Sequence, residues 1–178
     1  MPNHIAPHKN GSHCDAIQRS DMVELAIQGL ANLKVDKREL NRDKTSYTVE
    51  TLKEINAEYP NTPICFVMGM DSLINFTSWF QWQEILNYCH LVICARPGWK
   101  SEFNETIQTL LSKHQTTHIA QLHELQSGKI YFQDSTHFDI SSTQIRQNIS
   151  RDQNTLNVEN LLPPLVTDYI KQHLLYTK

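Results

Sequence analysis

A short polar stretch near the C-terminus, residues 140–146, has the residue types and the spacing of a helix start that can hold an anion. Ser141 is a favoured N-cap residue, and Gln144 three positions later completes a Ser-x-x-Gln capping box. Ile140 before the cap and Ile145 at the fourth helical position form the matching hydrophobic staple. The pattern therefore predicts that a helix begins here.

Phosphate binding is the chemistry that this helix start favours. The first turn of a helix presents unpaired backbone N–H groups and a partial positive charge. Ser141, Ser142 and Thr143 add hydroxyl donors, and Arg146 adds a planar guanidinium group that matches phosphate oxygens. An ordinary capped surface helix with a solvated arginine is the alternative, and for a capping box taken alone it is the commoner case.

A second candidate helix start follows the polar loop at residues 41–48. Apolar residues at helical spacing run from Val49 to Ile55, and Pro60 marks the end of the helix. Ser46 or Thr48 is expected to cap it, which would give another helix start that can face an anion. A plain cap is again the commoner alternative.

A polar group is also expected at the end of a buried strand. Residues 64–68 form a continuous apolar run, which is typical of a strand that is buried on both faces of a parallel sheet. Gly69 and Asp71 follow it directly, and open α/β sheets bind ligands at the carboxyl ends of their strands. Trp79 and Phe80 come next. Such aromatic side chains are more often part of a core than a platform for a ligand.

Composition limits the classes of function. The 178 residues carry a net charge of −3, so no broad basic surface favours nucleic acid. The four cysteines show no Cys-x-x-Cys spacing, and the histidines at the N-terminus follow no metal motif, so we expect a reducing compartment and no metal site. No stretch is long and apolar enough for a membrane span or a signal peptide, which favours the cytoplasm and no membrane partner.

Strands and helices alternate along the chain, and this order predicts an α/β fold with a parallel sheet in a single domain over residues 1–178. The expected strands lie at residues 33–35, 64–68, 90–95 and 129–132, and the expected helices begin near Asp15, Thr48, Phe103, Ser141 and Pro164. Every polar feature singled out above falls at a strand end or at a helix start.

Taken together, these residues resemble the bacterial nicotinate-nucleotide adenylyltransferases, a family of the nucleotidyltransferase superfamily with a Rossmann-like sheet. Each segment is weak evidence alone, but the set runs in family order over essentially the whole chain. The matching segments are Pro2-Asn3, Ala6-Pro7-His8-Lys9, Arg38-Glu39-Leu40 with Arg42, Ser46-Tyr47-Thr48, Gly69-Met70-Asp71-Ser72, Trp79, Arg96-Pro97-Gly98 and Ile140-Ser141-Ser142-Thr143-Gln144-Ile145-Arg146.

The resemblance implies transfer of AMP from ATP to nicotinate mononucleotide, which gives deamido-NAD and pyrophosphate, with Mg²⁺ on the phosphates. The phosphate of the mononucleotide would attack the α-phosphorus of ATP, so no protein nucleophile is needed. The protein would align the two substrates and neutralise charge in the transition state. By the same resemblance, Ser141, Ser142, Thr143 and Arg146 hold the ATP end.

The resemblance also implies a pyridine pocket. Tyr47, Thr48 and Trp79 would form it, with the Trp79 indole stacked on the ring. Backbone N–H groups near Thr48 and Phe80 would receive the nicotinate carboxylate.

Other residues would contact the rest of the dinucleotide. Gly69 would let it lie close to the strand end, and Asp71 would accept a hydrogen bond from a ribose hydroxyl. His8, Lys9 and Arg96 would face phosphates.

The sequence departs from the family in one respect. Members begin with a strand and a Gly-x-Phe-x-Pro-x-His-x-Gly-His signature, whose histidines bind the triphosphate, and these 178 residues contain no such signature. We therefore expect a first strand–helix–strand unit, roughly 30 or more residues, to be missing. We also expect the chain to have no adenylyltransferase activity by itself, and no catalytic residue is assigned within it.

Two alternatives remain open at this point. One is a non-catalytic nucleotide-binding remnant that keeps both pockets. The other is an adenylyltransferase of the same superfamily with another acceptor, such as phosphopantetheine. The aromatic pocket favours a flat pyridine ring over the second alternative.

Overall fold

The computed structural model describes residues 14–95, 102–134, 141–151 and 161–177, and it shows two compact units. The first unit comprises Met1–Ser46 and Asp139–Lys178, and the second comprises Tyr47–Phe138. The expectation of a single domain stays a prediction.

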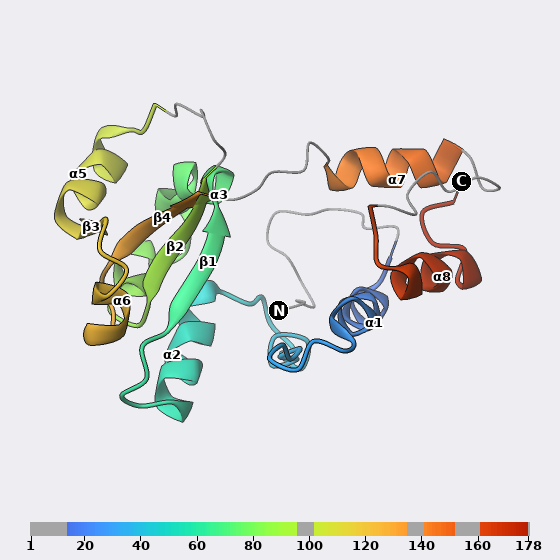
Figure 1. Cartoon of the computed structure of the whole chain (residues 1–178), viewed down its shortest axis with the longest axis horizontal. Coiled ribbons are helices and arrows are strands. Elements are labelled where there is room, and N and C mark those ends of the chain that lie inside the picture. The colour runs from blue at the N-terminus through green and yellow to red at the C-terminus, as the bar shows by residue number, and fades with distance from the viewer. Residues whose placement is uncertain (1–13, 96–101, 135–140, 152–160, 178) are drawn as a thin grey trace. The chain divides into compact units, whose positions relative to one another are not determined.

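The second unit contains a four-stranded parallel sheet, as predicted (Figure 1). The strand order is β1-β2-β4-β3, and each neighbouring pair runs parallel. The strands are β1 (Cys65–Gly69), β2 (His90–Ala95), β3 (Gln115–Thr116) and β4 (Ile130–Asp134). Three of them lie where the sequence predicted strands, whereas the two-residue β3 was not predicted.

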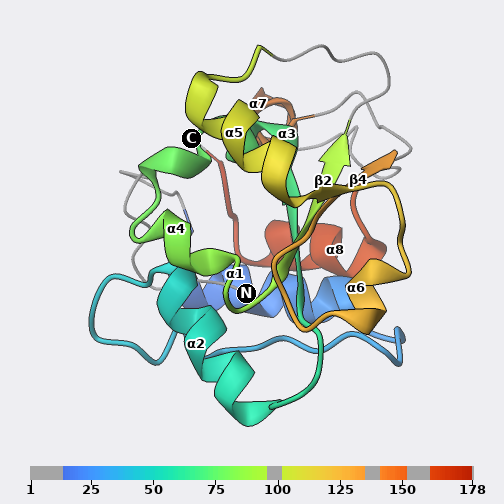
Figure 2. The same ribbon diagram turned by 90° about the vertical axis from the view of Figure 1, so that its left-hand side faces the viewer.

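Short helices connect these strands and pack on the sheet; in Figure 2, α4 and α5 lie in front of it. The helices expected after Thr48 and near Phe103 are present as α2 and α5. The helical elements of this unit are α2 (Thr48–Glu58), α3 (Met70–Ile74), the 3-10 turn η1 (Phe76–Ser78), α4 (Trp82–Ile85), α5 (Glu105–His114) and α6 (Gln121–Glu124).

The helices of this unit cover one face of its sheet. Phe66 and Met68 of β1 lie on that face, next to Leu91 and Ile93 of β2, in a core that includes residues of α2, α3, α4 and α5. The alternate residue Val67 is 61% exposed. The prediction that this strand is buried on both faces was therefore wrong, because within the unit only one face is covered.

A fully buried histidine anchors the loop that precedes β4. The Nδ1 atom of His90 lies 3.0 Å from the backbone nitrogen of Lys129, which can only donate, so Nδ1 is an acceptor. Nε2 therefore carries the proton, and it donates to the carbonyl oxygen of Leu125 at 2.9 Å. These bonds fix one neutral tautomer and hold the loop to the start of β2.

The first unit is helical in the residues that the structure describes. It contains α1 (Ala16–Ile27), α7 (Ser142–Arg151) and α8 (Pro164–Gln172). Asp15 caps α1, and Pro164 occupies the first turn of α8, as expected of a residue without a backbone N–H. None of the described helices is long and apolar enough to cross a membrane.

The strand predicted at residues 33–35 does not form. These residues follow a turn in which the Leu33 N–H donates to the Leu30 carbonyl at 3.1 Å. A strand needs a neighbour that accepts and donates its backbone hydrogen bonds, and the described part of the first unit contains no other strand. Local alternation of apolar and polar residues was insufficient evidence for this strand.

Burial of Cys89 makes the stability of the second unit sensitive to high pH. The side chain is 0% exposed, and burial raises the pKa of its thiol from 9.0 to about 12. Below pH 9 the thiol is protonated in both states. Above pH 9 the unfolded chain loses this proton and the folded chain keeps it, so stability falls by about 1.4 kcal/mol per pH unit until the folded thiol ionises.

We expect Cys89→Ala to flatten this dependence. Between pH 8 and pH 10, urea unfolding should show a loss about 1.4 kcal/mol smaller in the variant than in the unmodified chain. Burial raises the pKa of the Cys65 thiol of β1 less than that of Cys89, so Cys65→Ala is the comparison and should flatten the slope less. Equal slopes for Cys89→Ala and the unmodified chain would contradict the prediction.

Candidate functional site

The capping box at the start of α7 is present, as predicted. The Ser141 N–H donates to the Gln144 Oε1 atom at 2.7 Å, and the Gln144 N–H donates to the Ser141 Oγ atom at 3.1 Å. Ile145 packs against the core of the first unit. Its expected staple partner, Ile140, lies outside the described residues.

The other polar groups at this helix start face solvent. Ser141, Ser142, Thr143 and Arg146 are all exposed. The Arg146 Nη2 atom lies 3.5 Å from the Thr143 Oγ1 atom, which is long for a hydrogen bond between charged and polar groups. The guanidinium and hydroxyl groups are thus placed on one exposed helix turn, where they can bind phosphate oxygens.

The start of α2 differs from the prediction. Its N-cap is Tyr47, and no side chain caps it; Thr48 is the first helical residue. Ser46 is buried, and its Oγ atom is instead 3.5 Å from the Glu39 carbonyl oxygen. The prediction that Ser46 or Thr48 caps α2 was wrong, because neither side chain reaches the first-turn N–H groups. Within the part of the chain that the structure describes, no side chain caps those donors, in contrast to α1, α5 and α7.

Aromatic side chains gather beside this helix start. The rings of Tyr47 and Phe80 lie 4.5 Å apart between centroids and are tilted by 35°. Trp79 contacts Phe66 of β1 edge-on at 6.1 Å and Phe76 at 5.6 Å. Trp79 is therefore partly a core residue, while Phe80 keeps nearly half of its surface exposed.

An ion pair connects α2 and α4, the helices that follow Tyr47 and Phe80 in the chain. The Lys53 Nζ atom of α2 lies 2.7 Å from a Glu84 carboxylate oxygen of α4. This hydrogen bond raises the pKa of Lys53. The pair is exposed, so it helps to orient α2 beside α4 more than it stabilises the fold.

Gly69 and Asp71 lie at the carboxyl end of β1, as expected. Gly69 is the N-cap residue of α3 in an extended conformation, so its backbone does not require glycine. A Cβ atom at Gly69 would meet no atom of the described residues within 4 Å, which leaves open space beside them at the strand end. Asp71 is exposed in the first turn of α3.

The structure thus places the expected pyridine-pocket residues within one unit and brings two of them, Tyr47 and Phe80, into ring contact. The expected ATP-end residues lie together on α7 in the other unit. His8, Lys9 and Arg96, expected at phosphates, lie outside the described residues.

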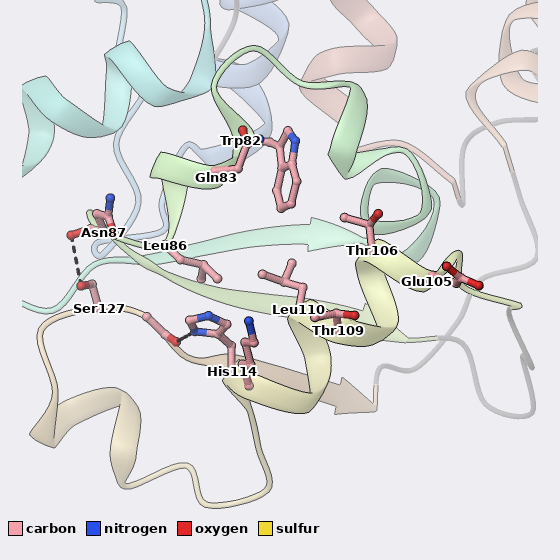
Figure 3. A pocket seen from close by; sticks show the side chains of 12 residues that line it. Trp82, Gln83, Leu86, Asn87, Glu105, Thr106, Thr109, Leu110, His114 and Ser127 are labelled. Carbon is pink, nitrogen blue, oxygen red and sulfur yellow. Dashed lines mark hydrogen bonds between the residues drawn. The ribbon is translucent and has the colours of Figure 1, made fainter.

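A groove of about 830 Å³ lies elsewhere in the second unit, between α4 and α5 (Figure 3). Trp82, Leu86 and Leu110 form its apolar surface. At one end the His114 Nδ1 atom lies 2.8 Å from the Gly128 carbonyl oxygen. None of the expected site residues lines it, and no sequence motif indicated it, because its residues come from three separate segments.

The described residues contain no group of three or more His, Cys, Asp or Glu side chains that could hold a metal ion. All four cysteines are free thiols.

Comparisons with known proteins identify the family of the chain. The model of the cytidylyltransferase-like family matches residues 1–148. The chain is 56% identical over 176 residues to a probable nicotinate-nucleotide adenylyltransferase of Psychromonas ingrahamii and 43% identical to that of Aeromonas hydrophila. Each match covers 99% of this chain and 81% of the relative.

A solved structure shows the same fold. The nicotinic acid mononucleotide adenylyltransferase of Plasmodium falciparum, in complex with NaAD, matches 97% of this chain and 78% of its own chain. The TM-score is 0.67 at 19% identity. The Rossmann-like α/β fold expected from the sequence is thus confirmed. On the strength of the family model and of relatives this similar over nearly its full length, the chain belongs to the nicotinate-nucleotide adenylyltransferase family of nucleotidyltransferases.

Proposed function

We propose that this protein transfers AMP from ATP to nicotinate mononucleotide. An oxygen of the mononucleotide phosphate attacks the α-phosphorus of ATP. The bond between the α-phosphorus and the oxygen that bridges it to the β-phosphate breaks. The products are deamido-NAD and pyrophosphate. The observation that carries the proposal is the aromatic cluster of Tyr47 and Phe80 beside the uncapped start of α2. A flat apolar surface next to backbone donors suits an aromatic ring that bears a carboxylate.

In this proposal the second unit binds the acceptor. Trp79 stacks on the pyridine ring, and the N–H groups of Thr48 and Phe80 receive its carboxylate. The open space at Gly69 lets the nucleotide approach the end of β1, and Asp71 accepts from a ribose hydroxyl.

The start of α7 binds the ATP end in this proposal. Ser141, Ser142 and Thr143 supply hydroxyl donors and Arg146 supplies the charge, since all four side chains are exposed on one helix turn. Mg²⁺ enters with ATP and neutralises charge on the phosphates. His8, Lys9 and Arg96 are proposed to contact phosphates as well. The compartment that fits ATP as a substrate and free thiols in the protein is the cytoplasm.

The test combines binding with turnover. The purified chain is titrated calorimetrically with ATP and with nicotinate mononucleotide. It is then incubated with ATP, Mg²⁺ and either nicotinate mononucleotide or phosphopantetheine, and the products are separated by chromatography. We expect the 178 residues to bind ATP and the pyridine nucleotide and, since they contain no histidine signature, to show no turnover by themselves. The same residues preceded by a strand–helix–strand unit that carries the signature should adenylylate nicotinate mononucleotide. Binding without turnover in that extended chain would favour the nucleotide-binding remnant, and adenylylated phosphopantetheine would replace the proposed acceptor.

A further inference from the structure

Helix α7 is held in the first unit by a small apolar contact. Ile145 and Ile149, one helical turn apart, are its residues in the second hydrophobic core, whereas Arg146 between them is exposed. Cys14 before α1 and three buried residues at the end of the chain complete this core; they are Val166, Ile170 and Leu175. The direction in which α7 presents Arg146 therefore depends on how this core is closed.

The chain after α8 closes the core through a strained turn. The Leu175 N–H donates to the Ile170 carbonyl at 3.0 Å, and the Leu174 N–H donates to the Lys171 carbonyl at 3.3 Å. This is the Schellman arrangement of a helix C-terminus, with Leu174 at the left-handed position, which usually carries glycine. Leu174 has φ +49° and Tyr176 has φ +62°. A backbone in this region persists only where its surroundings determine it.

Tyr176 follows this turn, and its side chain packs against the same core. Its ring packs against the cluster that holds Cys14 and Ile149, and its hydroxyl interacts with the Cys14 thiol. The Cys14 carbonyl in turn accepts from the Arg19 guanidinium at 2.9 Å. Tyr176 is thereby packed between the chain before α1 and the turn after α8.

The phenol of Tyr176 stays neutral at ordinary pH. Burial and the bond to Cys14 raise the pKa of Tyr176 to about 12, against the opposing charges of Arg146 and Arg19. A neutral phenol in this core does not neutralise the Arg146 guanidinium group. The charge of Arg146 is thus retained for an anionic ligand.

We propose that Tyr176 is a positioning residue for ATP binding: packed against the core that contains Ile149 of α7, it fixes the helix and so the direction of the Arg146 guanidinium. The inference rests on the proposed function, in which Arg146 binds ATP. Tyr176 itself does not touch the nucleotide in this scheme.

The test compares Tyr176→Ala with Tyr176→Phe and with Val166→Ala in the 178-residue chain. Val166 belongs to the same core but lies on α8 and not in the C-terminal turn. Calorimetry gives the affinities for ATP and for nicotinate mononucleotide, and hydrogen exchange gives the protection of the α7 amides. A displacement of about 1 Å in a charged contact is sufficient to lower the affinity for ATP about tenfold.

We expect Tyr176→Ala to lower the affinity for ATP about tenfold and to leave the affinity for nicotinate mononucleotide unchanged. Hydrogen exchange of the α7 amides should become faster. Tyr176→Phe should retain most of the ATP affinity, because the ring remains. Val166→Ala should lower the melting temperature with the ATP affinity retained. A loss of ATP affinity in Val166→Ala as large as that in Tyr176→Ala, or no loss in Tyr176→Ala, would overturn the proposal.

Further measurements separate this proposal from the proposed function. If Tyr176→Ala does not fold, Leu174→Gly provides a second test. Leu174 is 71% exposed and has a left-handed backbone, so glycine relieves strain there without removing core contacts. This variant should fold, and its α7 amides should be better protected from exchange. Unchanged α7 protection in Leu174→Gly would contradict the role of the turn. If the unmodified chain binds no ATP, the proposed function fails, and the exchange data at α7 still test whether Tyr176 positions the helix.

Discussion

Arg146→Ala should weaken ATP binding by about 1.5–3 kcal/mol, or roughly tenfold to a hundredfold, because it removes one charge-assisted contact to phosphate. The side chain is exposed on the first turns of α7, and its Nη2 atom lies 3.5 Å from the Thr143 Oγ1 atom, a weak contact. Little must therefore be broken before the guanidinium group can bind a phosphate. Arg146→Lys should recover little of the loss, since an ammonium group lacks the planar pair of donors.

The neighbouring Gln147 provides a matched control. It is exposed on the same helix, and Gln147→Ala should leave ATP affinity and the melting temperature unchanged. Titration calorimetry with ATP measures all three variants, and nicotinate mononucleotide serves as the second ligand. If Arg146→Ala and Arg146→Lys bind ATP as tightly as the unmodified chain, the ATP end does not lie at α7.

The helix starts show how far local sequence patterns can be trusted. At α7 the capping box forms between residues three apart, and nothing outside the helix is needed to complete it. At α2 the prediction failed, because Ser46 is buried and lies one residue too early, and the chain enters the helix through an extended Tyr47. The absence of a side-chain cap favours the prediction that the start of α2 faces an anion, since an uncapped helix start offers more N–H donors to a ligand than a capped one.

The strands show where contacts between residues distant in sequence determine the structure. The apolar run at residues 64–68 predicted a strand correctly, but its burial on both faces depends on which helices cover the sheet, and that information is distant in sequence. Residues 33–35 have a plausible local pattern and form no strand. Hydrogen-bonding partners, which sequence alternation does not specify, decide this outcome.

Several contacts of the candidate site left no signal in the sequence. The ring contact between Tyr47 and Phe80 joins residues 33 positions apart, and each had been singled out for a different reason. The C-terminal turn places Leu174 where glycine is the usual residue, so turn chemistry did not indicate it. Such features follow from packing, and only the folded chain shows them.

Nicotinate mononucleotide should bind more tightly than nicotinamide mononucleotide by about 1.5–3 kcal/mol, or roughly tenfold to a hundredfold, the value of a hydrogen bond to a charged group. The two ligands differ only in a carboxylate and a neutral carboxamide. The N-terminus of α2 offers backbone donors with no capping side chain among the described residues, and its dipole favours the negative charge. The carboxylate should therefore be selected by the main chain and not by a side chain of Thr48.

Thr48→Pro tests this origin directly. Thr48 is the first residue of α2, where proline is well tolerated, and Tyr47 before it has φ −112° and ψ 137°, an extended conformation that proline permits. The substitution removes one N–H group and should preserve the helix. We expect Thr48→Pro to lose most of the preference for nicotinate with its melting temperature retained, whereas Thr48→Ala, which keeps the N–H, should retain the preference. Calorimetry with both mononucleotides measures the ratio of affinities. A full preference in Thr48→Pro, or equal binding of the two ligands by the unmodified chain, would show that the start of α2 does not hold the carboxylate.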